Sequence, residues 1–365
     1  MSVKVSTELL KKSISNVVKG VSKNNLFPIT SLIGISTDVE NQKLHLYSTD
    51  NANYVKISCK AEVEDEFDIC ISADIFSKLI FKLSADIIEL EYENSTLTIN
   101  GNGVYTFSAI SDEEGNVVFP KIIDEVNIDE SSVKSIDAII LHNIININKA
   151  SITKDFTRPS ARGYLFDEEK ITTATSSVAC FNVKSTFNES ILVSPELMDL
   201  VAIFPESIKI NYVINDEDMY FYNDDKSIVI YGPKMSGIES YPDLSTFYKL
   251  EYPYCCKVSK SVLSNALDRI LLFVEELSQY SANFIFSSNQ ITLISTNNAT
   301  SENVSYISPI SDDVEFSGLI NVSLLKSQVD SLPGNNIFIY FGQDKTISIA
   351  TEAEDIKKVI VLVDL

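Results

Sequence analysis

The stretch SLIGISTDVENQKLHLYSTDNANYVKIS, from Ser31 to Ser58, decides the fold. It begins with an apolar strand and a polar turn. An alternating strand that ends in Ser-Thr follows, and then a short polar corner and a further strand. Alternation of apolar and polar residues between turn-forming stretches is typical of β-strands with one buried face. The stretch therefore predicts three consecutive strands.

The same order of elements returns twice further along the chain. A second block, RGYLFDEEKITTATSSVACFNVKS, runs from Arg162 to Ser185, and a third, ANFIFSSNQITLISTNNATSENVSYI, runs from Ala282 to Ile307. Self-similarity at a fixed period indicates repetition of one structural unit. The spacing is about 120 residues, which is an ordinary domain length.

An amphipathic helix is expected before each block. Ser6 or Thr7 would cap the first helix, Ser131 or Ser132 would open the second, and Ser259 would open the third. The apolar stripes of the three helices are Leu10, Ile14, Val17 and Val21; Val133, Ile136, Ile140, Ile144 and Ile147; and Val262, Leu263, Ala266, Ile270 and Val274.

Each block is followed by a strand that leads into a second capped helix, and hairpins close each unit. The expected caps are Ser72, Ser194 and Asn321 or Ser323, with Pro195 at the first helical position. Two helices and several antiparallel strands in each unit predict an α+β fold, with the helices on one face of a sheet. The expected domains are residues 1–124, 125–249 and 250–365.

The net charge of the 365-residue chain is −22, which argues against a protein that holds DNA through a large basic surface. Any role on DNA must depend on local positive charge or on topology, and the acidity can also simply keep the protein in solution. We expect no membrane span and no secretion signal. The five cysteines form no disulfide framework, which favours buried thiols in a reducing cytoplasm.

The sequence shows no catalytic centre that we recognise, and it predicts neither a cofactor nor a metal ion. His45 lies in an alternating strand and His142 on a helix, and neither belongs to an HExxH arrangement. The segment GNG at 101–103 is expected to be a hairpin turn rather than a phosphate loop. An acidic enzyme that uses carboxylates and a divalent ion stays open as an alternative.

Three segments, considered together, resemble the bacterial DNA polymerase III beta subunit, the DNA sliding clamp family. They are LFPITSLIGISTDVENQKLHLYSTDNANYV, ARGYLFDEEKITTAT and the C-terminal VIVLVDL. The first segment has the family's proline at Pro28, an apolar strand through Ile35, and a Thr-Asp corner at Thr49 and Asp50. The resemblance covers the whole chain.

The resemblance implies the DNA-clamp fold and a non-catalytic processivity factor of DNA replication. Two three-domain copies would close head to tail into a ring around duplex DNA, with helices lining the hole. The implied DNA-facing cations are Lys12, Lys19, Lys23, Lys78, Lys82, Lys134, Lys149, Lys154, Arg158, Lys260, Arg269 and Lys326. They can equally be ordinary solvated residues; as a lining, they predict loose contacts with phosphates that do not depend on sequence.

Sliding clamps bind short peptides of a DNA polymerase and a clamp loader in an apolar pocket between the second and third domains. The implied pocket residues are Ala161, Thr175, Ser177, Val178, Ala179, Cys180, Pro242, Phe247, Val359, Val361, Leu362 and Val363. The family has Gly-His-Arg-Leu at 177–180 and a Met-Pro-Met-Arg-like tail at 361–364. This chain differs at both places, which predicts altered partner specificity; alternatively, the tail is an edge strand that covers the core.

The resemblance also implies that Leu272 and Phe273 meet Tyr105 and Phe107 of a second copy. Bulky apolar residues on a surface commonly mark such contacts, although these four can instead fill the core of their own domain. A clamp-fold adaptor or decoy that binds replication proteins without encircling DNA is the other function that the sequence leaves open.

Overall fold

The computed structural model describes residues 1–22, 27–111, 121–124, 126, 128–153, 155, 157–184, 186–187, 189–276, 279–297, 299–310, 312–343 and 345–363. These residues form two compact units, Met1–His142 with Glu196–Lys234, and Asn143–Pro195 with Met235–Leu365. Within the described ranges, no helix has the length and hydropathy that a transmembrane span needs.

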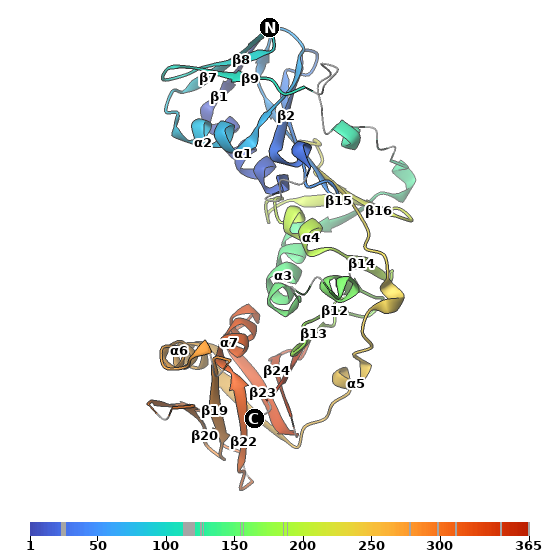
Figure 1. Ribbon diagram of the computed structural model, residues 1–365. Helices are drawn as coiled ribbons and strands as arrows, with labels where there is room; N and C mark the ends of the chain where they lie inside the picture. Colours follow the sequence, from blue (N-terminus) through green and yellow to red (C-terminus); the bar gives the residue numbers. More distant parts are fainter. Residues whose placement is uncertain are drawn as a thin grey trace. The chain divides into compact units, whose positions relative to one another are not determined.

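Two antiparallel sheets form the first unit (Figure 1). The smaller sheet has the order β5-β1-β7-β8-β9, and the larger has the order β10-β15-β16-β17-β4-β3-β2-β6. The strands of the smaller sheet are β1 (Ser2–Ser6), β5 (Glu62–Val63), β7 (Ile87–Glu93), β8 (Thr96–Asn100) and β9 (Val104–Ser108). Those of the larger sheet are β2 (Leu32–Asp38), β3 (Lys43–Thr49), β4 (Tyr54–Lys60), β6 (Asp68–Ser72), β10 (Lys134–Asp137), β15 (Lys209–Ile214), β16 (Asp218–Tyr222) and β17 (Ile228–Pro233).

Helices α1 (Thr7–Val17) and α2 (Ala73–Lys82) pack against each other in the first unit (Figure 1). Leu10, Ile14 and Val17 are fully buried on one face of α1, as the apolar spacing predicts. The first unit also contains the 3₁₀ turns η1 (Val18–Gly20), η2 (Pro28–Ser31), η3 (Lys121–Asp124) and η4 (Glu130–Ser132). Helices α3 (Ala138–Asn148) and α4 (Pro195–Val201) begin in one unit and end in the other.

The second unit has the same construction, with one sheet of eight strands and one of four. Their orders are β14-β11-β12-β13-β25-β24-β23-β18 and β21-β20-β19-β22. The strands are β11 (Tyr164–Phe166), β12 (Ile171–Ala174), β13 (Val178–Asn182), β14 (Ile191–Val193), β18 (Tyr254–Ser259), β19 (Ser281–Phe286), β20 (Gln290–Ser295), β21 (Ser301–Ser305), β22 (Phe316–Asn321), β23 (Asn336–Gln343), β24 (Thr346–Thr351) and β25 (Ile356–Val361).

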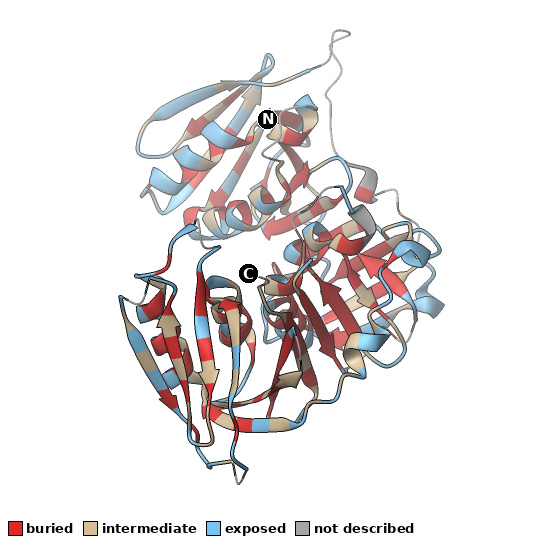
Figure 2. Ribbon diagram, turned by 60° about the horizontal axis from the view of Figure 1, so that its bottom comes forward, coloured by how far each residue is buried: buried red, intermediate tan, exposed pale blue. Residues whose placement is uncertain are grey.

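Helices α6 (Lys260–Leu271) and α7 (Val322–Ser331) pack together in this unit, and their buried residues join one large apolar core (Figure 2). The shorter helical segments are η5 (Lys149–Ser151), η6 (Pro159–Arg162), η7 (Ile238–Ser240) and α5 (Ser245–Tyr248). The Asn321 side chain caps α7 by accepting a hydrogen bond from the backbone N–H of Leu324.

The repeat predicted from the sequence is present three times in the order of elements. Each copy has a strand, a helix, three strands, a strand, a helix and three strands, with a two-residue extra strand, β5, in the first copy. The strand before the first helix of each copy, which is β1, β10 or β18, pairs with the first strand after its second helix. This is the expected α+β clamp fold.

The predicted start of the second copy's first helix is wrong. Residues 134–137 form β10, and α3 begins at Ala138 rather than at Ser131 or Ser132. Ile136 is therefore a strand residue, and Ile140 is 39% exposed. The buried side of α3 contains Ala138, Leu141, Ile144 and Ile145, because the helix begins later and its periodicity counts from a different residue.

Two junctions join the repeats through backbone hydrogen bonds. In the first unit β4 pairs antiparallel with β17, and in the second unit β13 pairs antiparallel with β25. Strands from two predicted domains thus continue one sheet, so the two compact units each contain part of residues 125–249. The boundaries at residues 124 and 249 stay a prediction.

Candidate functional site

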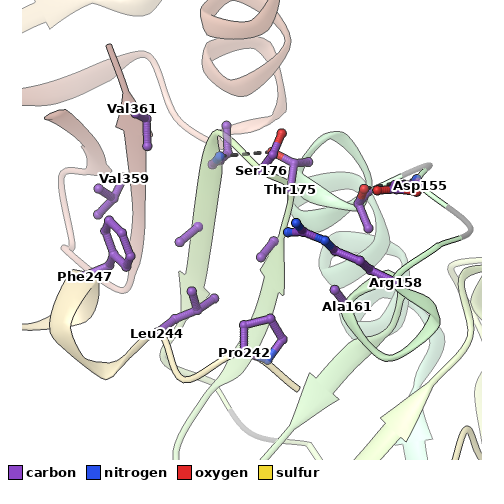
Figure 3. Close-up of a pocket in the computed structure, with 14 residues that line it drawn as sticks. Asp155, Arg158, Ala161, Thr175, Ser176, Pro242, Leu244, Phe247, Val359 and Val361 are labelled. Carbon is purple, nitrogen blue, oxygen red and sulfur yellow. Dashed lines mark hydrogen bonds between the residues drawn. The ribbon is translucent and has the colours of Figure 1, made fainter. Parts of the chain in front are cut away.

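A groove on the second unit is lined by strands β12, β13 and β25 and by the segment that leads from β17 to β18 (Figure 3). It encloses about 340 Å³. The described lining residues are Thr153, Asp155, Arg158, Ala161, Ala174, Thr175, Ser176, Val178, Ala179, Pro242, Leu244, Phe247, Val359 and Val361.

The apolar floor of the groove follows from strand pairing. Ala179 on β13 lies opposite Val359 on β25, and successive side chains of a strand point to opposite faces. Ala179, Val359 and the next outward residue, Phe181, form a small buried cluster. Leu244 and Phe247 pack against this cluster from the connecting segment. The junction between two repeats therefore presents small and branched apolar side chains at its surface.

The rim of the groove is polar. The Thr175 hydroxyl oxygen accepts hydrogen bonds from the backbone N–H groups of Ser177 and Val178, at 3.1 and 3.0 Å. Asp155 accepts from the hydroxyl and the backbone N–H of Thr157, and these bonds hold the pKa of its carboxyl below the usual value. Arg158, which the sequence grouped with the DNA-facing cations, also lines this groove. Among the described residues, the rim thus carries one guanidinium and one carboxylate.

Eight of the twelve predicted pocket residues line the groove, namely Ala161, Thr175, Val178, Ala179, Pro242, Phe247, Val359 and Val361. Ser177 is adjacent to the lining, where its carbonyl accepts a hydrogen bond from Val361 N–H. Cys180 points into the core with no exposed surface, and burial raises the pKa of its thiol. The strand alternation that aims Ala179 outward aims Cys180 inward.

Leu362 and Val363 also lie away from the groove lining. Leu362 packs against the core of the second unit, and its Cδ1 lies 2.7 Å from the position where a Cβ on Gly318 would be. Leu362 N–H donates to Lys345 O, and Val363 N–H donates to Leu319 O at 2.8 Å. The tail therefore fastens the end of β25 to β22, and β25 itself lies between β13 and β24 rather than at a sheet edge.

The sequence missed Thr153, Asp155, Ala174, Ser176 and Leu244 as lining residues. A signal existed for two of them. Ala174 pairs with Ala179 across β12 and β13, so alternation places both on one face. Leu244 lies in the same proline-containing segment as Pro242 and Phe247.

The strands β9 and β21 each lie at one end of a smaller sheet. In the described part of the chain, β9 borders only β8, and β21 borders only β20. Tyr105 and Phe107 lie on β9, where the Phe107 ring meets the buried Phe76 edge to face at 6.1 Å. Leu272 and Phe273 follow α6, which packs against β21, and they are 80% and 43% exposed. Leu272 therefore does not fill the core of its own domain.

The predicted DNA-facing cations of the first two repeats differ in their exposure, their ion pairing and the element on which they lie. Lys12, Lys19 and Lys82 are exposed, and Lys78 pairs with Asp74 at 2.7 Å. Lys134 is exposed on strand β10 rather than on a helix, and Lys149 is exposed in η5. Lys23 and Lys154 lie outside the described residues.

The three predicted cations of the last repeat are all engaged with neighbours. Arg269 makes two hydrogen bonds of 2.7 Å with the Glu302 carboxylate, which raise the pKa of Arg269 and lower that of Glu302. Lys326 lies 2.5 Å from Asp330 and 3.3 Å from Asp268. Lys260 donates to the carbonyl oxygens of Asp330 and Leu332. Nearby carboxylates and carbonyl oxygens thus already bind these three cations.

Comparison with known proteins gives one consistent family. Residues 1–118 match the family described as DNA polymerase III beta subunit, N-terminal domain. The beta sliding clamp of Bacillus subtilis (strain 168) is 21% identical over 296 residues, which span 76% of this chain and 75% of the relative. That of Halalkalibacterium halodurans is 24% identical over 182 residues, or 47% of this chain and 46% of the relative.

Solved structures show the same fold over the whole chain. The DNA polymerase sliding clamp of Bacillus subtilis superposes with a TM-score of 0.84 at 17% identity, covering 100% of this chain and 99% of that one. The beta subunit from DNA polymerase of Streptococcus pyogenes gives 0.85 at 13% identity, covering 100% of both chains. With the threefold repeat, these comparisons show that residues 1–118 match the DNA polymerase III beta subunit family and that the whole chain has the fold of the sliding clamps.

Proposed function

We propose that this protein is a sliding clamp of DNA replication: two copies close head to tail around duplex DNA and tether a DNA polymerase. One observation carries the proposal. Two strands at sheet ends, β9 and β21, are the counterparts of strands that are paired inside the chain.

The equivalence follows from the order of elements. In each repeat, one triplet of strands follows the first helix and a second triplet follows the second helix. At each internal junction, the last strand of one repeat's first triplet pairs with the last strand of the next repeat's second triplet: β4 pairs with β17, and β13 with β25. In the first and third repeats, β9 and β21 occupy these two positions. An unpaired edge is a template for another strand. Pairing β21 of one copy with β9 of the next repeats the same antiparallel junction.

Apolar side chains beside both edges favour this pairing. Val104 on β9 is 71% exposed, and Leu272, beside β21, is 80% exposed. An interface of this kind is heterologous, so it generates a ring where the rotation closes and a filament where it does not. A ring of two copies would contain six repeats.

DNA would be held by encirclement rather than by affinity. A net charge of −22 disfavours tight electrostatic binding, whereas a closed ring stays on DNA without it. The exposed Lys12, Lys19 and Lys82 provide local positive charge near the first two helices. We expect these lysines to contact phosphates without reading the bases.

The groove that contains Ala179, Phe247 and Val359 is the proposed site for short peptide segments of a polymerase and a clamp loader. It is concave and apolar, with a polar rim, which suits an anchored peptide. The Pseudomonas aeruginosa sliding clamp was solved bound to griselimycin, and the Borrelia burgdorferi beta subunit in complex with a natural product. Replacement of the family's Gly-His-Arg-Leu segment by Ser177–Cys180 supports a partner specificity different from that of its relatives.

The deciding experiment loads the protein onto nicked circular DNA with a compatible clamp loader and measures its retention by gel filtration. Linearising the circle should release the protein if the link is topological. A basic DNA-binding domain would stay bound to both forms.

The second candidate is a clamp-fold adaptor that binds replication proteins without encircling DNA. The neutralised cations of the third repeat favour it, because Arg269 and Lys326 are already paired. Light scattering separates the two functions: a monomer at micromolar concentration supports the adaptor and excludes the closed dimer.

A further inference from the structure

The first unit contains a second groove at the β4·β17 junction, in the position that corresponds to the groove at β13·β25. In both units a connecting segment crosses the face of the junction sheet. Ile123, Val126 and Ile128 pack on the sheet in the first unit, as Leu244 and Phe247 do in the second. The lining residues of the second groove are Lys56, Ile123, Asp124, Val126, Ile128, Glu130, Val133, Tyr220, Tyr222, Lys226 and Val229, around about 640 Å³.

Tyr220 and Tyr222 line this groove together with aliphatic side chains, and they belong to a row of four tyrosines. The Tyr54, Tyr231, Tyr220 and Tyr222 rings follow one another across β4, β17 and β16, with successive centroids 6.0, 6.5 and 5.6 Å apart. Burial raises the pKa of Tyr220 to about 12, so its hydroxyl remains a hydrogen-bond donor at neutral pH. Tyrosines combine a rigid apolar ring with a polar end, which is why they are enriched at binding surfaces.

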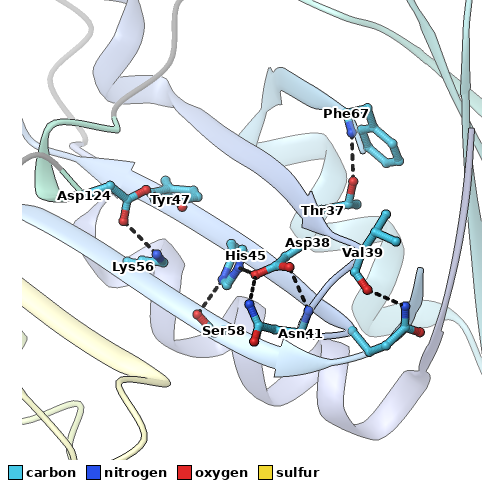
Figure 4. Close-up of polar contacts among 11 residues, drawn as sticks. Thr37, Asp38, Val39, Asn41, His45, Tyr47, Lys56, Ser58, Phe67 and Asp124 are labelled. Atoms are coloured by element: carbon cyan, nitrogen blue, oxygen red, sulfur yellow. Dashed lines mark hydrogen bonds and ion pairs between the residues drawn. The ribbon is translucent and has the colours of Figure 1, made fainter. Parts of the chain in front are cut away.

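A more acidic pocket adjoins this groove, because Lys56 and Asp124, whose ion pair is drawn in Figure 4, line both cavities. Asp124 accepts hydrogen bonds of 2.7 Å from the Tyr47 hydroxyl and from the Lys56 ammonium, and it lines both cavities. The neighbouring pocket encloses about 490 Å³ and adds Asp38, Glu66 and Asp68. The two adjoining cavities are together called the elongated groove.

The charge of this elongated groove is negative. Its described lining contains five carboxylates, those of Asp38, Glu66, Asp68, Asp124 and Glu130, and two ammonium groups, those of Lys56 and Lys226. His45 adds no charge near neutral pH, because burial lowers its pKa and its Nδ1 lies 2.7 Å from the Ser58 hydroxyl. Four of these carboxylates, those of Glu66, Asp68, Asp124 and Glu130, are exposed. A ligand that fits needs an apolar part beside cations.

We propose that this groove is a second docking site, which takes an extended peptide segment with apolar side chains next to lysines or arginines. The apolar side chains would lie on Tyr220, Tyr222 and the aliphatic residues beside them, and the basic residues would face the carboxylates of the groove, Glu66 and Glu130 among them. The comparison with the first groove rests on the proposed function, because only that function makes the first groove a peptide site. The charge of the second groove sets a different specificity: the first has one cation and one carboxylate at its rim, whereas the second is acidic.

The test measures fluorescence anisotropy of a labelled peptide, Gly-Ser-Leu-Ile-Ser-Lys-Lys-Lys-Ser-Gly, together with a peptide of reversed order, titrated with the full-length protein. We expect saturable binding of at least one of these two peptides. Replacing the three lysines with glutamates should abolish it. The double variant Glu66→Lys/Glu130→Lys should weaken binding about tenfold, because two attractive charges become repulsive.

A matched control has the same change in net charge at exposed carboxylates of the second unit, Glu168→Lys/Asp313→Lys. It should bind the peptide within twofold of the unsubstituted protein, as should Val361→Asp, which alters only the first groove. Loss of binding in Val361→Asp would place the peptide in the first groove and overturn the proposal. Equal weakening by the control pair, or no binding of either peptide, would also overturn it. Retention on circular DNA is scored separately, so failure of the ring and failure of this site are distinguishable.

Discussion

The ammonium nitrogen of Lys358, on β25, lies 2.7 Å from the carbonyl oxygen of Ile147, in the last turn of α3. It also donates to the Gln328 side-chain oxygen at 3.0 Å and to the Ser331 hydroxyl at 2.6 Å. The Lys358 side chain has no exposed surface. Three neutral acceptors thus satisfy the three N–H groups of a buried cation at the junction between the second and third repeats.

Stability should depend on pH through Lys358. Burial lowers the pKa of this lysine below its ordinary value of 10.5, so above the lowered pKa the unfolded chain binds more protons than the folded chain. Stability therefore rises with pH between the folded and the unfolded pKa. Urea unfolding of the original protein and of Lys358→Met at pH 7 and pH 10 should show the difference shifting in favour of lysine at the higher pH. An unchanged difference would contradict this.

Charge at the exposed end of α6 should break the dimer. The double substitution Leu272→Asp/Phe273→Asp places two carboxylates at the proposed apolar contact, where desolvation of unpaired charge costs several kcal/mol. We expect a monomer in light scattering and at least a hundredfold weaker association. The control is Val262→Asp on the same helix, which is 48% exposed and should remain a dimer. Monomers in both variants would remove Leu272 and Phe273 from the interface.

The first repeat should provide more of the binding to DNA than the third. Lys12→Gln/Lys19→Gln removes two exposed charges, whereas Arg269→Gln/Lys326→Gln removes the same charge from residues that are already paired. The lifetime on circular DNA should fall in the first pair. The slope of log affinity against log salt should become shallower by about 0.9 for each phosphate that the protein no longer neutralises. An equal or larger effect in the second pair would reverse this assignment.

Val361→Asp should weaken binding of a partner polymerase's peptide at the first groove by about tenfold or more, because a carboxylate would then lie on its apolar floor. Val183→Asp is a suitable control, since Val183 is 41% exposed and does not line the groove. Surface plasmon resonance with the immobilised peptide measures both. Unchanged affinity in Val361→Asp would show that the peptide binds elsewhere.

One cysteine should react with a maleimide in the folded protein. Cys255 is exposed, contrary to the expectation of buried thiols, whereas Cys59, Cys70, Cys180 and Cys256 are buried. Partial burial raises the pKa of the Cys255 thiol, so its labelling rate should increase as the pH rises toward 9. Mass spectrometry should find one label per chain, and Cys255→Ser should abolish it. Rapid labelling of a second cysteine would contradict the burial pattern.

The sequence predicted the repeated strands well because each repeat alternates with period two between clear turns. The strand before each first helix was missed, although Val3-Lys4-Val5-Ser6 and Cys256-Lys257-Val258-Ser259 repeat the same short pattern. Short strands of this kind are apolar on one face only, so a stripe such as that of Val133 and Ile136 fits a helix equally well. This ambiguity displaced the start of α3.

The groove was harder to predict because its residues come from different parts of the chain. Ala179 and Val359 meet only through the register of β13 and β25, which the sequence does not state. The family resemblance assigned Cys180 and Leu362 to the groove, yet Cys180 is buried in the core and Leu362 packs against the core. Successive side chains of a strand point to opposite faces, which turns Cys180 away from Ala179 and into the core.

The connecting segments at residues 109–133 and 234–253 make strand pairing within a chain independent of the protein concentration. Each tethers the two partners of an internal junction, so β4 finds β17 and β13 finds β25 at a concentration fixed by the chain itself. A pairing of β9 with β21 from another copy has no such tether and must weaken on dilution. Lowering the protein concentration should therefore break the β9–β21 contacts between copies first. The three modules of each chain should stay joined to one another.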